Sequence, residues 1–297
     1  MPLSNSQADD AIECIRGGLS HAAALDLALV LAAVGIGHRV VHASDGSSLW
    51  VKTERVEAAL AALAAYEREN ISTENRREMV KPMLRRNWAG VGLALFLLAV
   101  HVAASGDRDH HAYVRAYGAS ADQILSGELY RAVTALILHA DWGHLAANMA
   151  GCVIFATAVC AWVGSGVGVL LILAAGAVGN WISAVVYQSG HTAIGASTAV
   201  FGALGLIAAH QFIEKVKQPG MRIRAWLPIA GALALLGFLG VSERSDILAH
   251  FFGLVAGLGI GGVTTVMLTK APGAAVQNGC LALSLAVVVL AWMAGFG

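Results

Sequence analysis

The sequence ILAHFFGLVAGLGIGGVTTVML at residues 247–268 decides the fold, because it is apolar throughout and carries one ionisable side chain, His250. A helix of about 20 apolar residues spans a lipid bilayer. The sequence STAVFGALGLIAAHQFI at residues 197–213 is equally free of Asp, Glu, Lys and Arg. Both stretches are rich in Gly and Ala, as is common for helices that pack closely within a membrane. We therefore expect an all-α polytopic membrane protein.

The composition of the whole chain supports this fold class. Of its 297 residues, 57% are hydrophobic and 13% are charged, whereas about 25% of the residues of soluble domains are charged. The formal net charge is zero, so there is no electrostatic case for binding nucleic acid. The four cysteines, at positions 14, 152, 160 and 280, are widely spaced. They are predicted to be small buried hydrophobes rather than disulfides or zinc ligands, and no metal or cofactor is expected.

The apolar segments predict seven membrane spans, at about 88–105, 145–163, 166–187, 197–213, 225–241, 247–268 and 277–296. Basic residues lie before the first span and between the fourth and fifth. Because Lys and Arg accumulate on the cytoplasmic side of membrane proteins, both regions are placed in the cytoplasm. The loops 105–144, 188–196 and 242–246 then face outward.

Residues 1–80 are predicted to form a small soluble, cytoplasmic α+β domain. We expect a helix at 22–36, a hairpin around Asp45-Gly46 and a helix at 56–69, followed by a basic linker at 81–87. His38 and His42 could be a metal-binding pair. We favour the alternative that they are alternate residues of a solvated strand.

A serine lies at the start of one predicted span, in the sequence GASTAVFG at residues 195–202. The N-terminus of a helix presents free N–H groups and a positive dipole potential. Such a site suits a nucleophile, Ser197, whose reaction develops an oxyanion, and the small residues beside it allow a substrate backbone to approach. The alternative is that Ser197 only caps a tightly packed helix.

His250 is the candidate base for this serine. Gly253 and Gly257 follow it at i+3 and i+7, on its own side of the helix, where glycines allow close contact with a neighbouring helix. If that neighbour carries Ser197, the hydroxyl and the imidazole come within hydrogen-bond reach. Asp246, four residues earlier, could orient His250 as a third triad member. We favour the interpretation that Ser245-Asp246 caps the helix.

Two further polar residues, His144 and Asn148, are spaced i, i+4 and therefore share one face of the second span. Imidazole and amide side chains are neutral hydrogen-bond donors near neutral pH. Two such donors suit an oxyanion hole, although either could instead make a structural hydrogen bond between helices.

Together these motifs resemble the rhomboid family of intramembrane serine proteases. The resemblance rests on G-x-S-x-x-x-F-G at 195–202, A-H-x-x-G-x-x-x-G at 249–257 and H-x-x-x-N at 144–148. Glu128-Leu-Tyr-Arg131 with His139, and Gly179-Asn180, also resemble family segments. The resemblance implies a six-helix core at 88–270, with residues 271–297 as a seventh transmembrane helix. It also implies a Ser197–His250 dyad without an acidic member, supported by Gly195, Gly253 and Gly257, by Phe201 stacked on the histidine, and by Arg131 and His139 shaping the outer loop.

The sequence thus predicts an intramembrane serine endopeptidase. Its partners would be the lipid bilayer and membrane-protein substrates, single-pass or polytopic, cut near the outer face of a bacterial inner membrane. A transporter or channel is the main alternative, but no inverted repeat is evident and charged residues are absent from the span centres. A non-catalytic relative that escorts membrane proteins is disfavoured because both nucleophile and base are present. The oligomeric state does not follow from the sequence.

Overall fold

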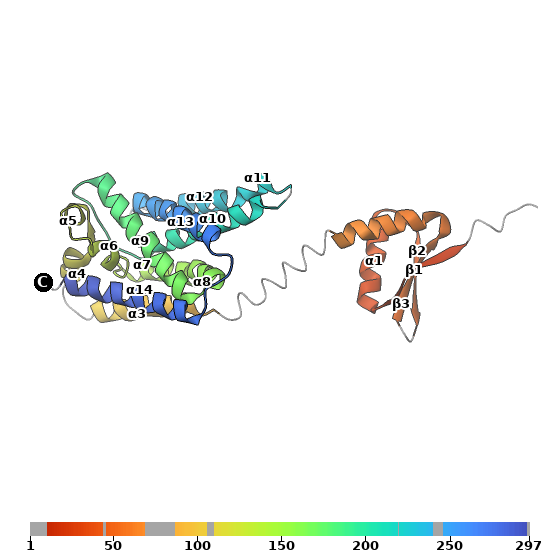
Figure 1. The fold of residues 1–297 in the computed structure, drawn as a ribbon, viewed down its shortest axis with the longest axis horizontal. Helices are drawn as coiled ribbons and strands as arrows, with labels where there is room; N and C mark the ends of the chain where they lie inside the picture. The colour runs from red at the N-terminus through yellow and green to blue at the C-terminus, as the bar shows by residue number, and fades with distance from the viewer. Residues whose placement is uncertain are drawn as a thin grey trace, which may run out of the picture. The chain divides into compact units, whose positions relative to one another are not determined.

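The computed structural model of the chain describes residues 11–43, 46–68, 87–105, 110–218, 220–239 and 246–295. The chain divides into two compact units, residues 1–82 and 83–297 (Figure 1). Each unit is described by itself below. The predicted linker at 81–87 lies outside the described residues, apart from its last residue.

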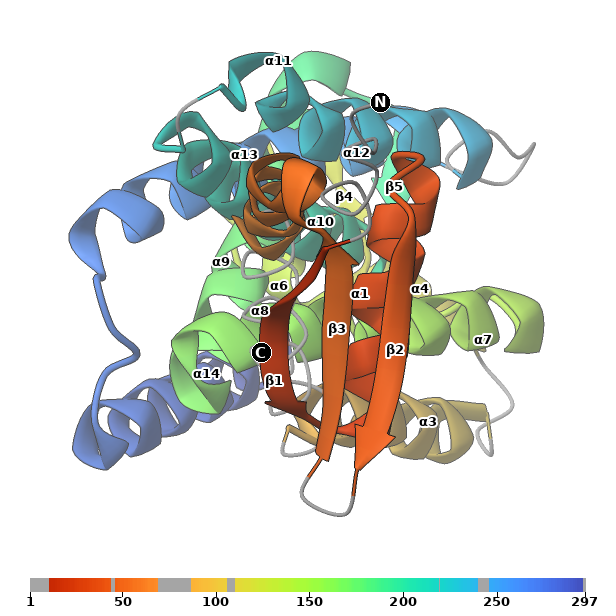
Figure 2. The ribbon, with the colours of Figure 1, turned by 90° about the vertical axis from the view of Figure 1, so that its right-hand side faces the viewer.

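The first unit is a three-stranded antiparallel sheet with helices packed on it. The sheet has the order β1-β3-β2, with β3 in the centre and α1 behind it (Figure 2). Its elements are β1 (Ile12–Leu19), α1 (His21–Ala33), β2 (His38–Ala43), β3 (Gly46–Lys52), the 3-10 turn η1 (Thr53–Arg55) and a helix at 56–68. The core combines strand residues such as Leu49 and Val51 with helix residues such as Leu31 and Leu63.

The predicted helix–hairpin–helix order was incomplete, because it lacked β1. The segment Ile12–Leu19 contains Gly17-Gly18, and its pairing with β3 shifts register twice. Glycine is depleted in strands, and a shifting register hides the alternation of apolar residues, so the sequence pattern concealed this strand. His38 and His42 lie on β2 as favoured, and the Nδ1 of His42 lies 2.8 Å from the Ser47 hydroxyl.

The second unit is helical, with two short strands. Its elements are α3 (Ala89–Ser105), α4 (His110–Tyr117), β4 (Ala119–Ser120), α5 (Ala121–Leu125), α6 (Arg131–Thr134), α7 (Trp142–Gly151), the π-turn η2 (Cys152–Ala156), α8 (Thr157–Val163), α9 (Ser165–Tyr187), β5 (Thr192–Ala193), α10 (Ser197–Val216), α11 (Arg222–Ala225), α12 (Leu227–Leu239), α13 (Ile247–Met267) and α14 (Ala274–Ala294). The run α7–η2–α8 is continuous from Trp142 to Val163.

Five helices are long and apolar enough to cross a membrane. They are Trp142–Val163, Ser165–Tyr187, Ser197–Val216, Ile247–Met267 and Ala274–Ala294. The other two predicted spans are helices of 17 and 13 residues within the described part of the chain, α3 and α12. At 1.5 Å per residue, 13 residues cover about 20 Å, which is less than the thickness of the hydrocarbon core. Seven crossings therefore remain a prediction.

Helix α10 lies at the centre of the second unit. Its contact with α13 is the most extensive between any two described elements, and it also packs against α9 and α12. Small residues line these contacts: a Cβ added at Gly202 would lie 2.8 Å from the Cβ of Ala175 on α9, and one added at Gly261 would lie 2.7 Å from Leu206 on α10. The close packing follows from the Gly and Ala content that the sequence displayed.

The seventh helix, α14, packs on the core through α9 and α6. Near its start, Gln277 accepts a hydrogen bond from the backbone N–H of Val167 (3.0 Å) and donates one to the carbonyl of Val163 (2.8 Å). Near its end, Trp292 stacks on Tyr117 of α4, with 4.3 Å between ring centroids. Both ends of α14 are therefore attached to the other helices.

Candidate active site

Ser197 is the first residue of α10 and is half-buried. The two residues before it are held by the preceding loop: the N–H of Gly195 donates to the carbonyl of Ala135 (2.9 Å), and the N–H of Ala196 donates to His139 (3.4 Å). Gly195 has a φ of +125°, and a Cβ there would lie 2.5 Å from the His144 ring. Glycine is needed at this position for both reasons.

The base candidate, His250, is buried in the first turn of α13. Helices α10 and α13 run parallel, since a Cβ at Gly253 would collide with Thr198 and a Cβ at Gly257 would collide with Gly202. His250 lies one turn before Gly253. The register therefore brings it to the first turn of α10, where Ser197 lies.

The aromatic contact predicted for His250 is present. The ring of Phe201 stacks on the imidazole at 4.7 Å between centroids, with an interplanar angle of 28°. Phe201 is one turn after Ser197 on the same face of α10. The imidazole is thus held on the face of α10 that carries the serine.

Gly179 on α9 completes the packing beneath the serine. A Cβ there would lie 2.7 Å from the Thr198 side chain and 2.8 Å from Gly253, so three helices meet at this point. The next residue, Asn180, is buried and donates a hydrogen bond to the carbonyl of Ala132 (3.0 Å). The Gly179-Asn180 pair therefore has a packing role beside the candidate dyad.

His144 and Asn148 lie on α7, which also contacts α10. The Cβ position at Gly195 lies 2.5 Å from Cε1 of His144 and 3.6 Å from Oγ of Ser197, so the ring and the hydroxyl border the same point. His144 also lies close enough to His250 to interact with it electrostatically. Asn148 is buried, and its Nδ2 donates to the carbonyl of His144 (2.9 Å).

His139 supports the serine loop as a neutral imidazole. Its Nδ1–H donates to the carbonyl of Ile137 (3.2 Å), and its Nε2 accepts from the N–H of Ala196. Burial, with a smaller effect of His144, lowers the pKa of His139 to about 4. The neutral form that this geometry requires is therefore the one present near neutral pH.

Arg131 shapes the predicted outer loop. Its guanidinium donates to the carbonyls of Arg115 (2.8 Å) and Gly118 (3.3 Å) and to the carboxylate of Glu128 (2.7 Å). Its hydrogen bond, together with one from Tyr130, lowers the pKa of the Glu128 carboxyl. Arg131 thus links α4 to the start of α6. None of these three hydrogen bonds goes to the loop that precedes Ser197.

Asp246 caps α13, as the sequence favoured, because its Oδ1 accepts from the N–H of Ala249 (2.9 Å). Ser245 lies outside the described residues. This carboxylate has two further partners that the sequence did not predict, Tyr187 and His191. One signal was present, since His191 lies in the short predicted outer loop that leads to the serine.

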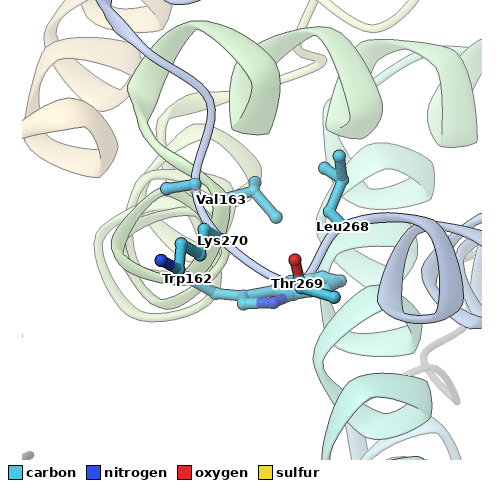
Figure 3. Close-up of a pocket in the computed structure, with 6 residues that line it drawn as sticks. Trp162, Val163, Leu268, Thr269 and Lys270 are labelled. Carbon is cyan, nitrogen blue, oxygen red and sulfur yellow. The ribbon is translucent and has the colours of Figure 1, made fainter.

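A cavity of about 320 Å³, lined by Val114, Arg115, Ser120, Gln123 and Thr192, has neither Ser197 nor His250 in its lining. A cavity of about 150 Å³ is lined by Trp162, Val163, Leu268, Thr269, Lys270 and Ala271 (Figure 3). It lies beyond the end of α13 opposite His250, about 25 Å away by the helical rise. No group of three or more His, Cys, Asp or Glu that could hold a metal ion is found within the described residues.

Residues 126–266 match the family model described as the Rhomboid domain. This part of the chain, just under half of its length, is similar to the rhomboid domain. The resemblance inferred from the motifs is confirmed, and the matched range includes Arg131, His139, His144, Asn148, Ser197 and His250. The first unit, α3 and α14 lie outside it. With its five apolar helices, the chain is an integral, multi-pass helical membrane protein.

A relative from Bacillus subtilis (strain 168) is named "Putative rhomboid protease YdcA". It is 25% identical to this chain over 134 residues, which is 45% of this chain. The match covers 66% of the relative's own length, slightly less than two thirds.

Proposed function

We propose that this chain is an intramembrane serine endopeptidase with Ser197 as nucleophile and His250 as base. The main support is the parallel contact of α10 with α13, in which Phe201 stacks on His250 one turn from Ser197. A serine is a weak nucleophile alone and is activated by an adjacent base. The rhomboid domain supports the same reaction class.

In the proposed first step, the imidazole of His250 removes the hydroxyl proton of Ser197. The oxygen then attacks the carbonyl carbon of a substrate peptide bond, and the carbonyl oxygen becomes an oxyanion. The N–H of Ser197 at the start of α10 and the side chains of His144 and Asn148 would donate hydrogen bonds to it. Donors placed for the developing charge stabilise the transition state more than the substrate.

The imidazolium of His250 then gives its proton to the leaving amine as the peptide C–N bond breaks, and an ester on Ser197 remains. In the second half of the reaction, a water molecule deprotonated by His250 attacks this ester. The ester C–O bond breaks, the new carboxyl group is released, and His250 returns the proton to the Ser197 oxygen. Water must therefore reach the N-terminal ends of α7, α10 and α13. These steps need no metal or cofactor.

The substrates would be single-pass or polytopic membrane proteins, cut within a transmembrane segment near the outer membrane face. Segments with weak helical propensity near the cut should be favoured, because an intact helix hides its peptide bonds. Basic residues in the last turn of α10 and in α11, such as Lys215 and Arg224, support a cytoplasmic location for that side. The first unit would then be cytoplasmic, and the membrane a bacterial inner membrane.

The test is to purify the Ser197→Ala and His250→Ala variants in detergent and to assay cleavage of a model transmembrane substrate. We expect both to lose cleavage, and Ser197→Ala also to lose labelling by a fluorophosphonate probe. Retention of the wild-type rate by either variant would refute the dyad.

Matched controls are available on α9 and α10. Ser183→Ala removes another buried serine, whose hydroxyl has no hydrogen-bond partner among the described residues. His210→Gln replaces a histidine of α10 that stacks on Trp162, thirteen residues after Ser197. Both should retain cleavage and labelling. A transporter, in contrast, should not react with the probe at Ser197.

A further inference from the structure

One carboxylate joins three segments beside the candidate dyad. Besides capping α13 through Ala249, Asp246 accepts a hydrogen bond from the hydroxyl of Tyr187 at 3.2 Å, and its Oδ2 lies 2.6 Å from Nε2 of His191. The side chain of Asp246 is 13% exposed and that of His191 is 27% exposed. The contact is therefore largely shielded from solvent, where ionic hydrogen bonds gain strength.

The cap alone does not explain this arrangement. Capping uses one carboxylate oxygen and one backbone N–H. The second oxygen of Asp246 faces a residue 55 positions away in the sequence. Because a carboxylate only accepts hydrogen bonds, Nε2 of His191 carries the proton in this contact. The ring of His191 also stacks on Tyr187, with 3.7 Å between centroids, which fixes its orientation.

The three segments joined in this way are the ones that carry the candidate chemistry. Asp246 lies one turn before His250 on α13, and His191 lies six residues before Ser197 in the loop that leads to α10. Tyr187 is the last residue of α9, which packs against both of these helices.

The loop between α9 and α10 has little other regular structure. In the described residues its strand pairing is the two-residue β5 against β4. Single hydrogen bonds also hold the loop: the N–H of Gly190 donates to the carboxylate of Asp122 (3.1 Å), and the N–H of Ala121 donates to the carbonyl of His191 (2.9 Å). The bonds of Gly195 and Ala196 described above hold its end next to α10. The titratable groups that face Asp246 are thus Tyr187 of α9, His191 of the loop and, within electrostatic range, His250 of its own helix.

We propose that Asp246 is a positioning residue that sets the distance between Ser197 and His250 by bonding the serine loop to the base helix through His191 and Tyr187. This inference rests on the proposed function. Loss of the bond would remove neither catalytic side chain, but it would let the loop and α13 move apart. A misplacement of about 1 Å can lower a rate about 100-fold.

The experiment uses the full chain in detergent. It separates the role of Asp246 as a helix cap from its hydrogen bonds to His191 and Tyr187. Asp246→Ser keeps a capping hydroxyl but is too short to reach His191 and Tyr187. His191→Phe keeps a stacking ring without the hydrogen bond, and His191→Gln keeps a donor. Tyr187→Phe removes one hydroxyl only and serves as a mild variant if Asp246→Ser fails to fold. Glu214→Gln, which removes an exposed ion pair with Lys217 at the far end of α10, is the control.

The readouts are kcat and KM for a model transmembrane substrate, the rate of fluorophosphonate labelling, and the melting temperature. For Asp246→Ser and His191→Phe we expect kcat and labelling to fall about 10- to 100-fold with KM within about twofold. We expect Tyr187→Phe to lose a smaller factor, and His191→Gln to stay within about threefold of wild type. An unchanged kcat in Asp246→Ser, or equal losses in His191→Phe and His191→Gln, would overturn the inference.

The two proposals fail in different ways. If the unmodified chain neither cleaves nor labels, the proposed function and this inference both fall. If it is active and the Asp246, His191 and Tyr187 variants are equally active, the inference alone falls.

Discussion

The ring of Phe201 lies 4.7 Å from the imidazole of His250, nearly parallel to it. The contact joins two helices at the turn that holds the candidate dyad. A stacked ring restricts the rotation of the imidazole and so fixes the direction of its nitrogens. The same contact excludes water from one face of the base.

Replacement of Phe201 by leucine tests this restriction. Leucine keeps most of the apolar volume but cannot stack, so we expect kcat to fall about 10-fold while the melting temperature changes little. Phe212→Leu is the matched control, because Phe212 lies on the same helix as Phe201 but far from Ser197, where its ring contacts Trp226. Equal kcat values in Phe201→Leu and the wild type would contradict a role for the stack.

Close packing of α10 on α13 is tested at Gly257. An alanine Cβ there would collide with the backbone of Gly202, so Gly257→Ala should separate the helices. We expect a loss of about 1–3 kcal/mol of stability. The rate of cleavage should fall by more than the fraction of folded protein falls. Gly259→Ala is the control on the same helix, because a Cβ at Gly259 meets no atom within 4 Å. Thermal unfolding in detergent and substrate cleavage measure the two effects, and a Gly257→Ala variant as active as Gly259→Ala would exclude this contact as a requirement.

Gln277 gives a test of the seventh helix. Its amide serves both the carbonyl of Val163 and the N–H of Val167, where the chain turns between α8 and α9. Gln277→Ala leaves two backbone groups without their partner and should cost about 1–3 kcal/mol of stability. Asn278→Ala, at an exposed neighbouring position, should cost little. The melting temperatures of the two variants decide whether α14 stabilises the core, and equal values would argue against it.

A pH dependence of stability follows from His139. Its pKa of about 4 in the folded chain lies below the ordinary value of 6.5, so the unfolded chain binds the proton more readily. Stability should therefore fall as pH drops from about 6.5 to about 4, by about 3 kcal/mol from this residue, and then level off. In His139→Gln, whose side-chain oxygen can still accept from Ala196, this part of the decline should disappear. Unfolding curves between pH 7 and pH 4 measure the difference, and parallel declines in both proteins would count against the assignment.

The features of the site that lie within one helix could be predicted from the sequence, whereas the contacts between distant segments could not. The spacing of Gly253 and Gly257 after His250 correctly predicted a face for close helix contact, and the i, i+4 spacing of His144 and Asn148 correctly predicted a shared face. Such periodicities are written into one helix and can be read from it.

The bonds of Asp246 to Tyr187 and His191 join residues more than fifty positions apart and follow no period. The links of Gln277 to the turn between α8 and α9 are of the same kind. Strand β1 was hidden for a different reason, since its two glycines and its shifting register mask the alternation of apolar residues. Contacts of this type depend on how the helices and loops are arranged, which local patterns do not encode.

The role proposed for Asn148 is the most direct test of the oxyanion hole. In the structure one N–H of its amide donates to the carbonyl of His144, on its own helix, and the amide has a second N–H that a developing oxyanion could use. Since the backbone of α7 also serves that carbonyl, Asn148→Ala should change stability little. We expect kcat to fall about 100- to 1,000-fold with KM nearly constant, because the donor acts on the transition state and not on the bound substrate. The comparison is Asn180→Ala, which removes another buried amide, one that donates to the carbonyl of Ala132. Its effect should be mainly on the melting temperature and not on kcat. If Asn148→Ala cleaves at the wild-type rate, the oxyanion must be stabilised without this side chain.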